Sequence, residues 1–154
     1  MKEIRLTQGQ VALVDDEDYE ALARFKWQAI WNATAQTYYA RRSSGPGKVY
    51  MHRQVTDALV GEEVDHINHN GLDNRRGNLR RCSVAQNRRN ARKRARCSSQ
   101  FKGVRWNKQA GKWQAMIMKR HLGFFADETK AALAYNKAAR QEFGEYALLN
   151  EVAA

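Results

Sequence analysis

The chain has 154 residues, of which 43% are hydrophobic, and a formal net charge of +11 from 27 Lys and Arg against 16 Asp and Glu. This length allows one ordinary domain or two to three small ones, and it excludes a large barrel or a doubly wound sheet. The apolar content is sufficient for packed cores. No apolar run approaches the roughly 18 residues of a membrane span, and the first ten residues do not resemble a secretory leader. Two cysteines are too few for a disulfide scaffold, so we expect a cytoplasmic protein without a membrane partner.

The charge is concentrated in the centre of the chain. Residues 1–64 carry 8 basic and 9 acidic side chains, residues 65–100 carry 10 and 2, and residues 101–154 carry 9 and 5. The net charges are therefore −1, +8 and +4. A near-neutral first part followed by a strongly basic centre indicates a polyanionic partner, with nucleic acid the first choice. A solvated, highly charged helix face is the alternative.

The first 61 residues are predicted to be rich in β-structure. Four acids at 15–18 favour the start of a helix, and a second short helix is predicted over 53–59, with Gly61 as its end. Gly45-Pro46-Gly47 is a strong turn sequence. Strands are predicted from short apolar or aromatic segments at residues 4–6, 11–14, 26–31, 37–41 and 49–51.

Residues 62–97 have a different character. A short strand is predicted over 64–67, and residues 68–77 form a polar loop rich in Asn, Gly and Asp. Ser83 and Gln86 have the spacing of a capping box, which predicts a basic helix from Val84 to about residue 96. The polar segment 97–100 then predicts a domain boundary.

The last third is predicted to form a second α+β unit. Three strands are expected over 101–106, 112–118 and 120–125, followed by a helix over 128–143 that Asp127 caps and Gly144 ends. Strand alternation places Trp113, Ala115 and Ile117 on one face, toward the alanine-rich helix. The predicted architecture is thus a three-stranded antiparallel sheet packed on one helix.

Residues near the centre have the chemistry needed to hydrolyse a phosphodiester bond. Asp65 follows a predicted strand, and its carboxylate is a hard oxygen ligand suited to Mg²⁺ or Mn²⁺. The neighbouring His66 is of a type that titrates near neutral pH and can take a proton from water. Asn87, in the first turn of the basic helix, can offer an amide oxygen to a one-metal site.

Three arginines on the same predicted helix, Arg88, Arg89 and Arg92, are expected to bind phosphates of the scissile strand. Taken singly, an Asp-His pair is more typical of a turn cap or surface pair, and an Asn in a helix is usually structural. Metal ligands, a base and phosphate-binding cations close together in the sequence are what indicate a phosphodiesterase.

The stretch DHINHNGLDNRRGNLR at residues 65–80, followed by Asn87, closely resembles the HNH family of nucleases, and most of all phage and intron-encoded homing endonucleases. The resemblance implies a β-hairpin and a helix around one divalent metal ion. It implies that Asp65 and Asn87 bind this ion, that His66 is the general base, and that Asn78 holds the loop together and orients His66. Asn87 replaces the final His of the motif.

On this resemblance the first domain covers residues 1–97, with a β-rich lead-in at 1–61 and the ββα-metal motif at 62–97. The lead-in also resembles that of phage proteins, which implies action in the cytoplasm of a bacterial host. His69 is expected to be structural or to contact phosphate, and His52 to be packed or hydrogen-bonded. Cys82 and Cys97 do not form a close CxxC pair, so they are expected to be reduced thiols and not zinc ligands.

The segments FKGVRW (101–106), GKWQA (111–115), LGFF (122–125) and AALAYNKAA (131–139) resemble the plant ethylene-response-factor domain of the APETALA type. That family lays a three-stranded sheet in the major groove of DNA, so residues 98–154 are expected to bind duplex DNA. The alternative is a plain core with an exposed basic sheet. The resemblance places eight residues at DNA-contacting positions: Lys102, Arg105, Asn107, Met116, Met118, Lys119, His121 and Tyr135. Methionine cannot make the bidentate guanine contact of arginine, so weak base specificity is expected.

The sequence therefore predicts a metal-dependent HNH endonuclease of phage homing type that nicks double-stranded DNA with one Mg²⁺ or Mn²⁺ ion. No obligatory protein partner is expected. The alternative is a DNA-binding regulatory protein with a degenerate nuclease centre, against which the intact motif residues argue. A third interpretation, an RNA-binding module, lacks exposed aromatic residues for stacking beyond Trp106.

Overall fold

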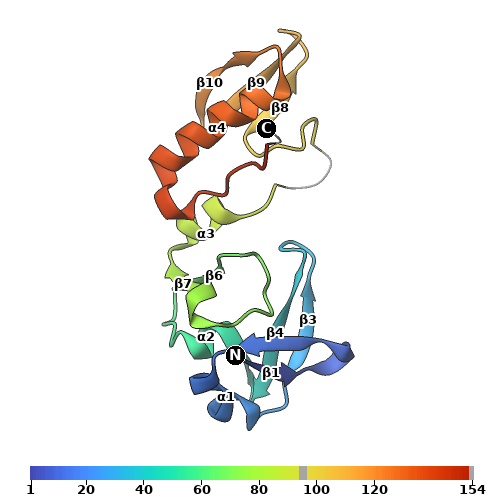
Figure 1. Cartoon of the computed structure of the whole chain (residues 1–154), viewed down its shortest axis with the longest axis vertical. Helices are drawn as coiled ribbons and strands as arrows, with labels where there is room; N and C mark the ends of the chain where they lie inside the picture. The colour runs from blue at the N-terminus through green and yellow to red at the C-terminus, as the bar shows by residue number, and fades with distance from the viewer. Residues whose placement is uncertain (94–96, 153–154) are drawn as a thin grey trace. The chain divides into compact units, whose positions relative to one another are not determined.

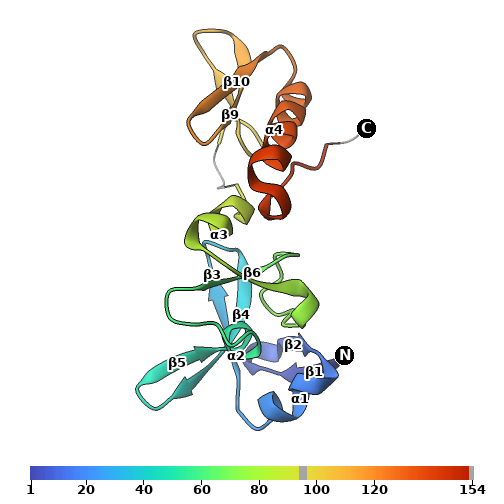
Figure 2. The ribbon, with the colours of Figure 1, turned by 90° about the vertical axis from the view of Figure 1, so that its left-hand side faces the viewer.

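The computed structural model describes residues 1–93 and 97–152. The chain is a mixed α/β protein with several small sheets, and it divides into two compact units, Met1–Asn87 and Arg88–Ala154 (Figures 1 and 2). The domain boundary expected at residues 97–98 falls within the second unit, and helix α3 (Val84–Asn90) crosses from the first unit into the second. None of the described helices is both long enough and apolar enough to cross a membrane.

The first unit contains three small antiparallel sheets and two short helices. β1 pairs with β2, β4 lies between β3 and β5, and β6 pairs with β7. The elements are β1 (Lys2–Arg5), β2 (Val11–Val14), α1 (Asp16–Ala23), β3 (Gln28–Asn32), β4 (Thr37–Ser44), β5 (Gly47–Tyr50), α2 (Met51–Val55), β6 (Glu63–His66) and β7 (Leu79–Cys82).

One hydrophobic core holds the elements of this unit together. Leu22 of α1, Trp27, and Met51 of α2 are almost fully buried in it, and side chains from β1, β2, β4, β6 and β7 join them. Trp27 also donates its indole Nε1–H to the carbonyl oxygen of Leu22, at 2.9 Å, which satisfies the polar atom of a buried aromatic. The core therefore fixes the β6–β7 hairpin against the rest of the unit.

The second unit is built on a three-stranded antiparallel sheet in the order β10-β9-β8. Its strands are β8 (Val104–Asn107), β9 (Lys112–Ile117) and β10 (Arg120–Phe125), and helix α4 (Glu128–Phe143) follows. Asp127 caps α4 by accepting a hydrogen bond from the backbone N–H of Lys130, and the helix ends at Gly144, which has φ of 53°. Both predicted boundaries of this helix are confirmed.

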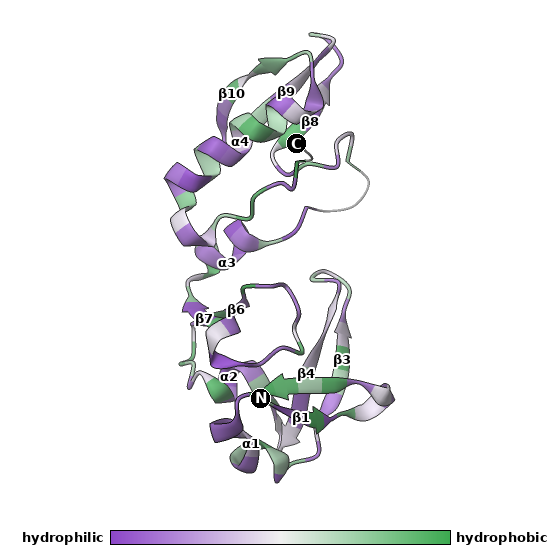
Figure 3. Ribbon diagram, in the orientation of Figure 1, coloured by the Kyte–Doolittle hydropathy of each residue, from purple (hydrophilic) through white to green (hydrophobic). Residues whose placement is uncertain are grey.

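The face of β9 that was predicted to meet the helix does so. Ala115 packs with Ala131 and Ala132, and Ile117 packs with Tyr135 and with alanines further along α4. The hydropathy colouring shows the alternation of apolar and polar stretches along the strands and along α4 (Figure 3). Alanine side chains are small, so the backbone of α4 can lie close to the backbone of the sheet.

A second close approach in this unit requires a glycine. A Cβ atom at Gly103 would lie 2.0 Å from the Tyr135 ring, and this residue has φ of 75°, a conformation that favours glycine. The Tyr135 ring is therefore held directly under the turn before β8. Burial raises the pKa of its hydroxyl to about 12.

Two helices are shorter than predicted. α3 was expected to reach about residue 96, but it ends at Asn90, and residues 91–93 are not helical; residues 94–96 lie outside the described residues. α2 was expected over 53–59, whereas it occupies Met51–Val55, so Met51 is helical and not part of a strand. In both places a side chain donates hydrogen bonds to backbone carbonyls at or beyond the end of the helix. Lys102 does so after α3, and Arg53 binds the carbonyls of residues 58, 59 and 62 after α2.

Candidate active site

The β6–β7 hairpin positions the two adjacent residues of the motif. In the antiparallel register Asp65 lies opposite Arg80 and His66 lies opposite Leu79. Successive residues of a strand point to opposite faces, so Asp65 shares a face with Glu63 while His66 points the other way. Both are buried, with 6% and 5% of their surface exposed.

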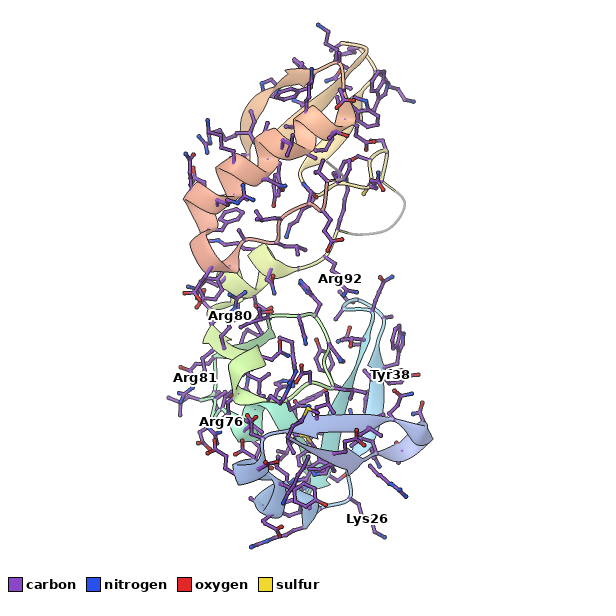
Figure 4. The ribbon with its side chains drawn as sticks, viewed as in Figure 1. Lys26, Tyr38, Arg76, Arg80, Arg81 and Arg92 are labelled. Atoms are coloured by element: carbon purple, nitrogen blue, oxygen red, sulfur yellow. The ribbon has the colours of Figure 1, made fainter. Side chains whose placement is uncertain are left out.

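Asp65 forms a buried ion pair with Arg80. Asp65 Oδ2 accepts hydrogen bonds from Arg80 Nε at 2.9 Å and from the terminal nitrogen Nη2 at 2.7 Å. The side chains are only 7% and 13% exposed. Arg80 and Arg81 follow one another on β7 (Figure 4), but Arg81 is about half exposed and lies 3.6 Å from Glu62. A charged pair withdrawn from water is strongly coupled, so Arg80 is a structural partner of Asp65 that the sequence analysis did not identify.

His66 lies in an apolar, aromatic environment. Its ring centroid is 5.6 Å from that of Tyr39 and 5.1 Å from that of His52, and its Nε2 has no hydrogen-bond partner. Burial lowers the pKa of His66 to about 4, although Asn74 and the charge of Asp65 act in the opposite direction. The imidazole is therefore neutral at pH 7, and a neutral imidazole with an unpaired ring nitrogen can accept a proton.

His52 and the tyrosines form the wall against which His66 rests. His52 stacks on Tyr50 at 5.5 Å and meets Tyr39 edge-on at 5.4 Å. Its Nδ1 has no hydrogen-bond partner, and burial lowers its pKa to about 3. His52 was expected to be either packed or hydrogen-bonded. Its ring is packed against Tyr39 and Tyr50, and its Nδ1 makes no hydrogen bond to a described residue. Burial, together with the charges of Asp65 and Glu63, raises the pKa of Tyr39.

Gly71 explains how the aromatic wall and the polar loop come together. A Cβ atom at this position would lie 2.4 Å from the carbonyl oxygen of Tyr38 and 2.6 Å from the ring of Tyr39. The backbone of residue 71 thus passes directly over β4. Gly71 N also donates to Thr37 Oγ1 at 3.0 Å, which fastens the loop to the same strand.

Asn78 joins the two ends of the loop. Its Oδ1 accepts from the backbone N–H of Asn68 at 3.0 Å, and its Nδ2 donates to Asn68 Oδ1 and to the carbonyl oxygen of Asp73. The backbone N–H of Ile67, directly after His66, donates to the carbonyl oxygen of Asn78 at 2.9 Å. These contacts fix the backbone on the C-terminal side of His66.

Asp73 and Asn74 anchor the loop from within. Asp73 is 2% exposed and accepts from Asn68 and twice from Arg75, and the Arg75 guanidinium lowers its pKa. Asn74 is fully buried, and its backbone N–H donates to the carbonyl oxygen of Leu13 on β2. Most of the Asn and Asp side chains in the run that predicted a loop are therefore joined in one hydrogen-bond network, while Asn74 Oδ1 has no hydrogen-bond partner among the described residues.

Oxygen donors for a cation gather on the Asp65 face of β6. Asn87 Nδ2 lies 3.5 Å from Glu63 Oε2, which places the amide next to a carboxylate two residues from Asp65. Glu63 is a third oxygen donor that strand alternation could have revealed. In the described part of the chain, no group of three or more His, Cys, Asp or Glu is arranged to hold a metal. The donors here, two carboxylates and an amide, nevertheless have the hard-oxygen chemistry that fits Mg²⁺ or Mn²⁺.

The three arginines predicted to bind phosphates belong to the second unit. Arg88 and Arg92 are exposed, and the Arg89 guanidinium lies over the Phe143 ring at 5.0 Å. The structure does not place them relative to His66. Cys82 is buried with its pKa raised to about 11, mainly by burial, and Cys97 is exposed; both are free thiols, as predicted.

The residues predicted to contact DNA in the second unit have varied surroundings. Lys102 Nζ donates to the carbonyl oxygens of Arg89 and Ala91, and burial lowers its pKa to about 8. Arg105 is exposed and donates to Gln114 Oε1 at 2.9 Å. Met118 is exposed, and Tyr135 is buried.

The remaining predicted contacts lie at or near the ends of strands. Asn107 Oδ1 accepts from the backbone N–H of Ala110 in the β8–β9 turn, while Lys119 and His121 are exposed. A cavity of about 350 Å³ adjoins Met116 and Met118. Its other lining residues are Lys93, Cys97, Lys102, Gly103, Val104, Arg105 and Tyr135.

Comparisons with known proteins agree with the hairpin and its loop. Residues 49–89 match the family model described as HNH endonuclease. The chain is also 28% identical over 159 residues to an uncharacterized HNH endonuclease of Acanthamoeba polyphaga mimivirus, an alignment that covers 94% of this chain and 76% of the viral protein. No solved structure matches the chain. These likenesses support an HNH endonuclease domain in the segment that contains His52, His66, Asn78 and Asn87.

Proposed function

We propose that this protein is a metal-dependent endonuclease that hydrolyses phosphodiester bonds in duplex DNA, with His66 as its general base. The observation that carries the proposal is the state of His66. It is buried, neutral at pH 7 and unpaired at Nε2, and it is the last residue of β6, in the hairpin that lies inside the HNH match. A general base must be deprotonated at working pH and held in one orientation.

The surrounding residues orient this base. The rings of Tyr39 and His52 contact one side of the imidazole, and the hydrogen bonds of Asn78 fix the backbone that follows it. His66 then takes a proton from the attacking water and holds it on the ring. The charges of Asp65 and Asp73 favour the protonated ring, so they stabilise the imidazolium that forms.

A divalent cation, Mg²⁺ or Mn²⁺, would be held by Asp65 and Asn87, with Glu63 beside them. When bound, such an ion neutralises charge on the phosphate and on the leaving oxygen. Arg80 already pairs with Asp65 Oδ2. A bound metal ion would therefore either share the Asp65 carboxylate with the Arg80 guanidinium or replace it. The same pair favours the second candidate, a DNA-binding regulatory protein in which the carboxylate no longer serves catalysis.

The second unit is proposed to tether the nuclease to DNA. Its net charge, its three-stranded sheet and the resemblance of its sequence to plant ethylene-response-factor domains support this role. The homing type and the phage source remain part of the same proposal and rest on the sequence resemblance alone.

Incubation with supercoiled plasmid and Mg²⁺ or Mn²⁺ tests the proposal. The parent chain should produce nicked circles, and His66→Ala should reduce the rate by roughly 10²–10⁴-fold while DNA affinity is retained. His69→Asn removes the other imidazole of the same loop, and Asn tolerates the positive φ of 60° at this position, so its rate shows whether the loss is particular to His66. Binding without nicking by the parent would favour the regulatory protein.

A further inference from the structure

The segment that forms the β3–β4–β5 sheet carries only positive charge. Residues 21–56 contain six Lys and Arg and no Asp or Glu, although residues 1–64 as a whole are close to neutral. The acidic residues within residues 1–64 all lie outside that segment, at positions 3–20 and 57–63. A sheet of this composition, in the unit that contains His66, has the electrostatic character of a surface that faces a polyanion.

The register assigns the side chains of this sheet to two faces. Tyr38 and Arg42 lie on the face turned to the core, where Arg42 sits over the rings of Phe25 and Trp27 and donates to Gln54. Tyr38, on β4, is labelled in Figure 4. The other face carries the residues that alternate with them, Tyr39 and Arg41, because side chains of a strand alternate.

The face that carries Tyr39 and Arg41 adjoins the candidate active site. Tyr39 contacts His66, and Tyr50, which lies opposite Arg41 across β4 and β5, stacks on His52. Arg41 is two residues from Tyr39 on the same face, a step of about 7 Å along the strand. Ring contacts therefore connect His66 with Tyr39 and Tyr39 with Tyr50, and Arg41 lies beside both tyrosines on the same face of the sheet.

Arg41 differs from the arginines around it. Arg42 is bound to Gln54, Arg53 donates to three backbone carbonyls, and Arg80 pairs with Asp65. In the described residues the Arg41 guanidinium has no hydrogen bond or ion pair, although its residue is half-buried. A partly desolvated cation with no partner in the protein can gain one from a ligand, and its planar donors match phosphate oxygens.

We propose that Arg41 binds a backbone phosphate of the DNA that His66 cleaves, and that the β3–β4–β5 face with Tyr39 and Arg41 is a DNA-contacting surface of the nuclease unit. The proposal rests on the proposed function for the identity of the ligand. The sequence analysis assigned phosphate binding to arginines after Asn87, which belong to the second unit. The proposal adds a phosphate contact in the first unit, from a residue on the same sheet face as Tyr39.

The test is a salt titration of DNA affinity with the full chain carrying His66→Ala, so that DNA is not cut. Affinity for a fluorescent duplex is measured over a range of salt concentrations with Arg41→Gln, Arg41→Lys and Arg24→Gln added separately. Arg24 is an exposed arginine of the same segment, at the end of α1, with no side-chain contact among the described residues, so it controls for lost charge alone.

Loss of one phosphate contact should make the slope of log affinity against log salt shallower by about 0.9. Arg41→Gln should show this change together with a roughly tenfold loss of affinity, since it removes a charge-assisted hydrogen bond to a phosphate. Arg41→Lys should keep the slope, and Arg24→Gln should leave slope and affinity near those of the parent. The same slope for Arg41→Gln as for the parent would overturn the proposal, as would equal losses for Arg41→Gln and Arg41→Lys. Absence of nicking by the chain with His66 intact would refute the nuclease function, while the slope change would still establish the DNA contact.

Discussion

Asp65→Ala is predicted to destabilise the first unit strongly, whether or not Asp65 binds a metal ion. The substitution leaves the Arg80 guanidinium, with 13% of its side chain exposed, without the carboxylate that accepts two of its hydrogen bonds. Removing one partner of a buried pair typically costs about 3–5 kcal/mol in the free energy of unfolding. This is a large part of the roughly 5–15 kcal/mol that stabilises an ordinary domain.

The assay is urea unfolding of the full chain, followed by the fluorescence of Trp27. Trp31, Trp106 and Trp113 are replaced by Phe in every variant, so that the signal comes from Trp27, which is 2% exposed in the first unit. With a slope of about 2 kcal/mol per molar urea, a loss of about 4 kcal/mol lowers the midpoint by roughly 2 M.

A second variant separates the ion pair from a ligand role. Asp65→Ala with Arg80→Met removes both charges, and replacing a buried pair by apolar side chains is often neutral for stability. The double variant should therefore recover most of the midpoint but remain without nuclease activity. A change of less than about 1 kcal/mol in Asp65→Ala would mean that the pair contributes only what an exposed pair does, and would refute the reasoning.

The other predictions concern metal dependence and pH. Asn87→Ala should raise the Mn²⁺ concentration needed for half-maximal nicking, and an unchanged midpoint would remove Asn87 from the ligand set. The folded unit holds His66 and His52 neutral, with pKa values of about 4 and about 3, below the ordinary 6.5. The unfolded chain therefore binds more protons as pH falls below 6.5, and stability should decrease from there to about pH 4 by up to about 1.4 kcal/mol per pH unit for each histidine. Urea midpoints from Trp27 fluorescence check this, and midpoints that stay constant between pH 7 and pH 5 would contradict it.

Local sequence patterns determined much of the secondary structure and the motif. The Ser83–Gln86 capping box is present as predicted, since Ser83 N donates to Gln86 Oε1 at 2.8 Å and Gln86 N donates to Ser83 Oγ at 3.2 Å. Asp127 and Gly144 limit α4 as predicted. Such features depend on residues three or four positions apart, which is why the sequence alone determines them.

The sequence also singled out His66 and Asn78 as candidate site residues, but not the residues that surround them. Tyr39 and His52 come from elements far from the motif in sequence, and no local pattern relates either residue to His66. Strand β7 was not predicted either, because LRRC has little apolar alternation; pairing with β6 forms it.

Tertiary structure alone decided what each charged group does. Arg80 and Arg41 have the same side chain, and no sequence rule distinguishes them. The antiparallel register gives Arg80 the carboxylate of Asp65, whereas Arg41 lies across from Tyr50 and has no ion pair within residues 1–93 and 97–152. At the end of α3, the Lys102 ammonium, thirteen residues from Arg89, donates to the carbonyl oxygens of Arg89 and Ala91. Spacing along the chain predicts which groups are present, but their charge partners and burial depend on contacts between distant segments, and these exist only in the folded chain.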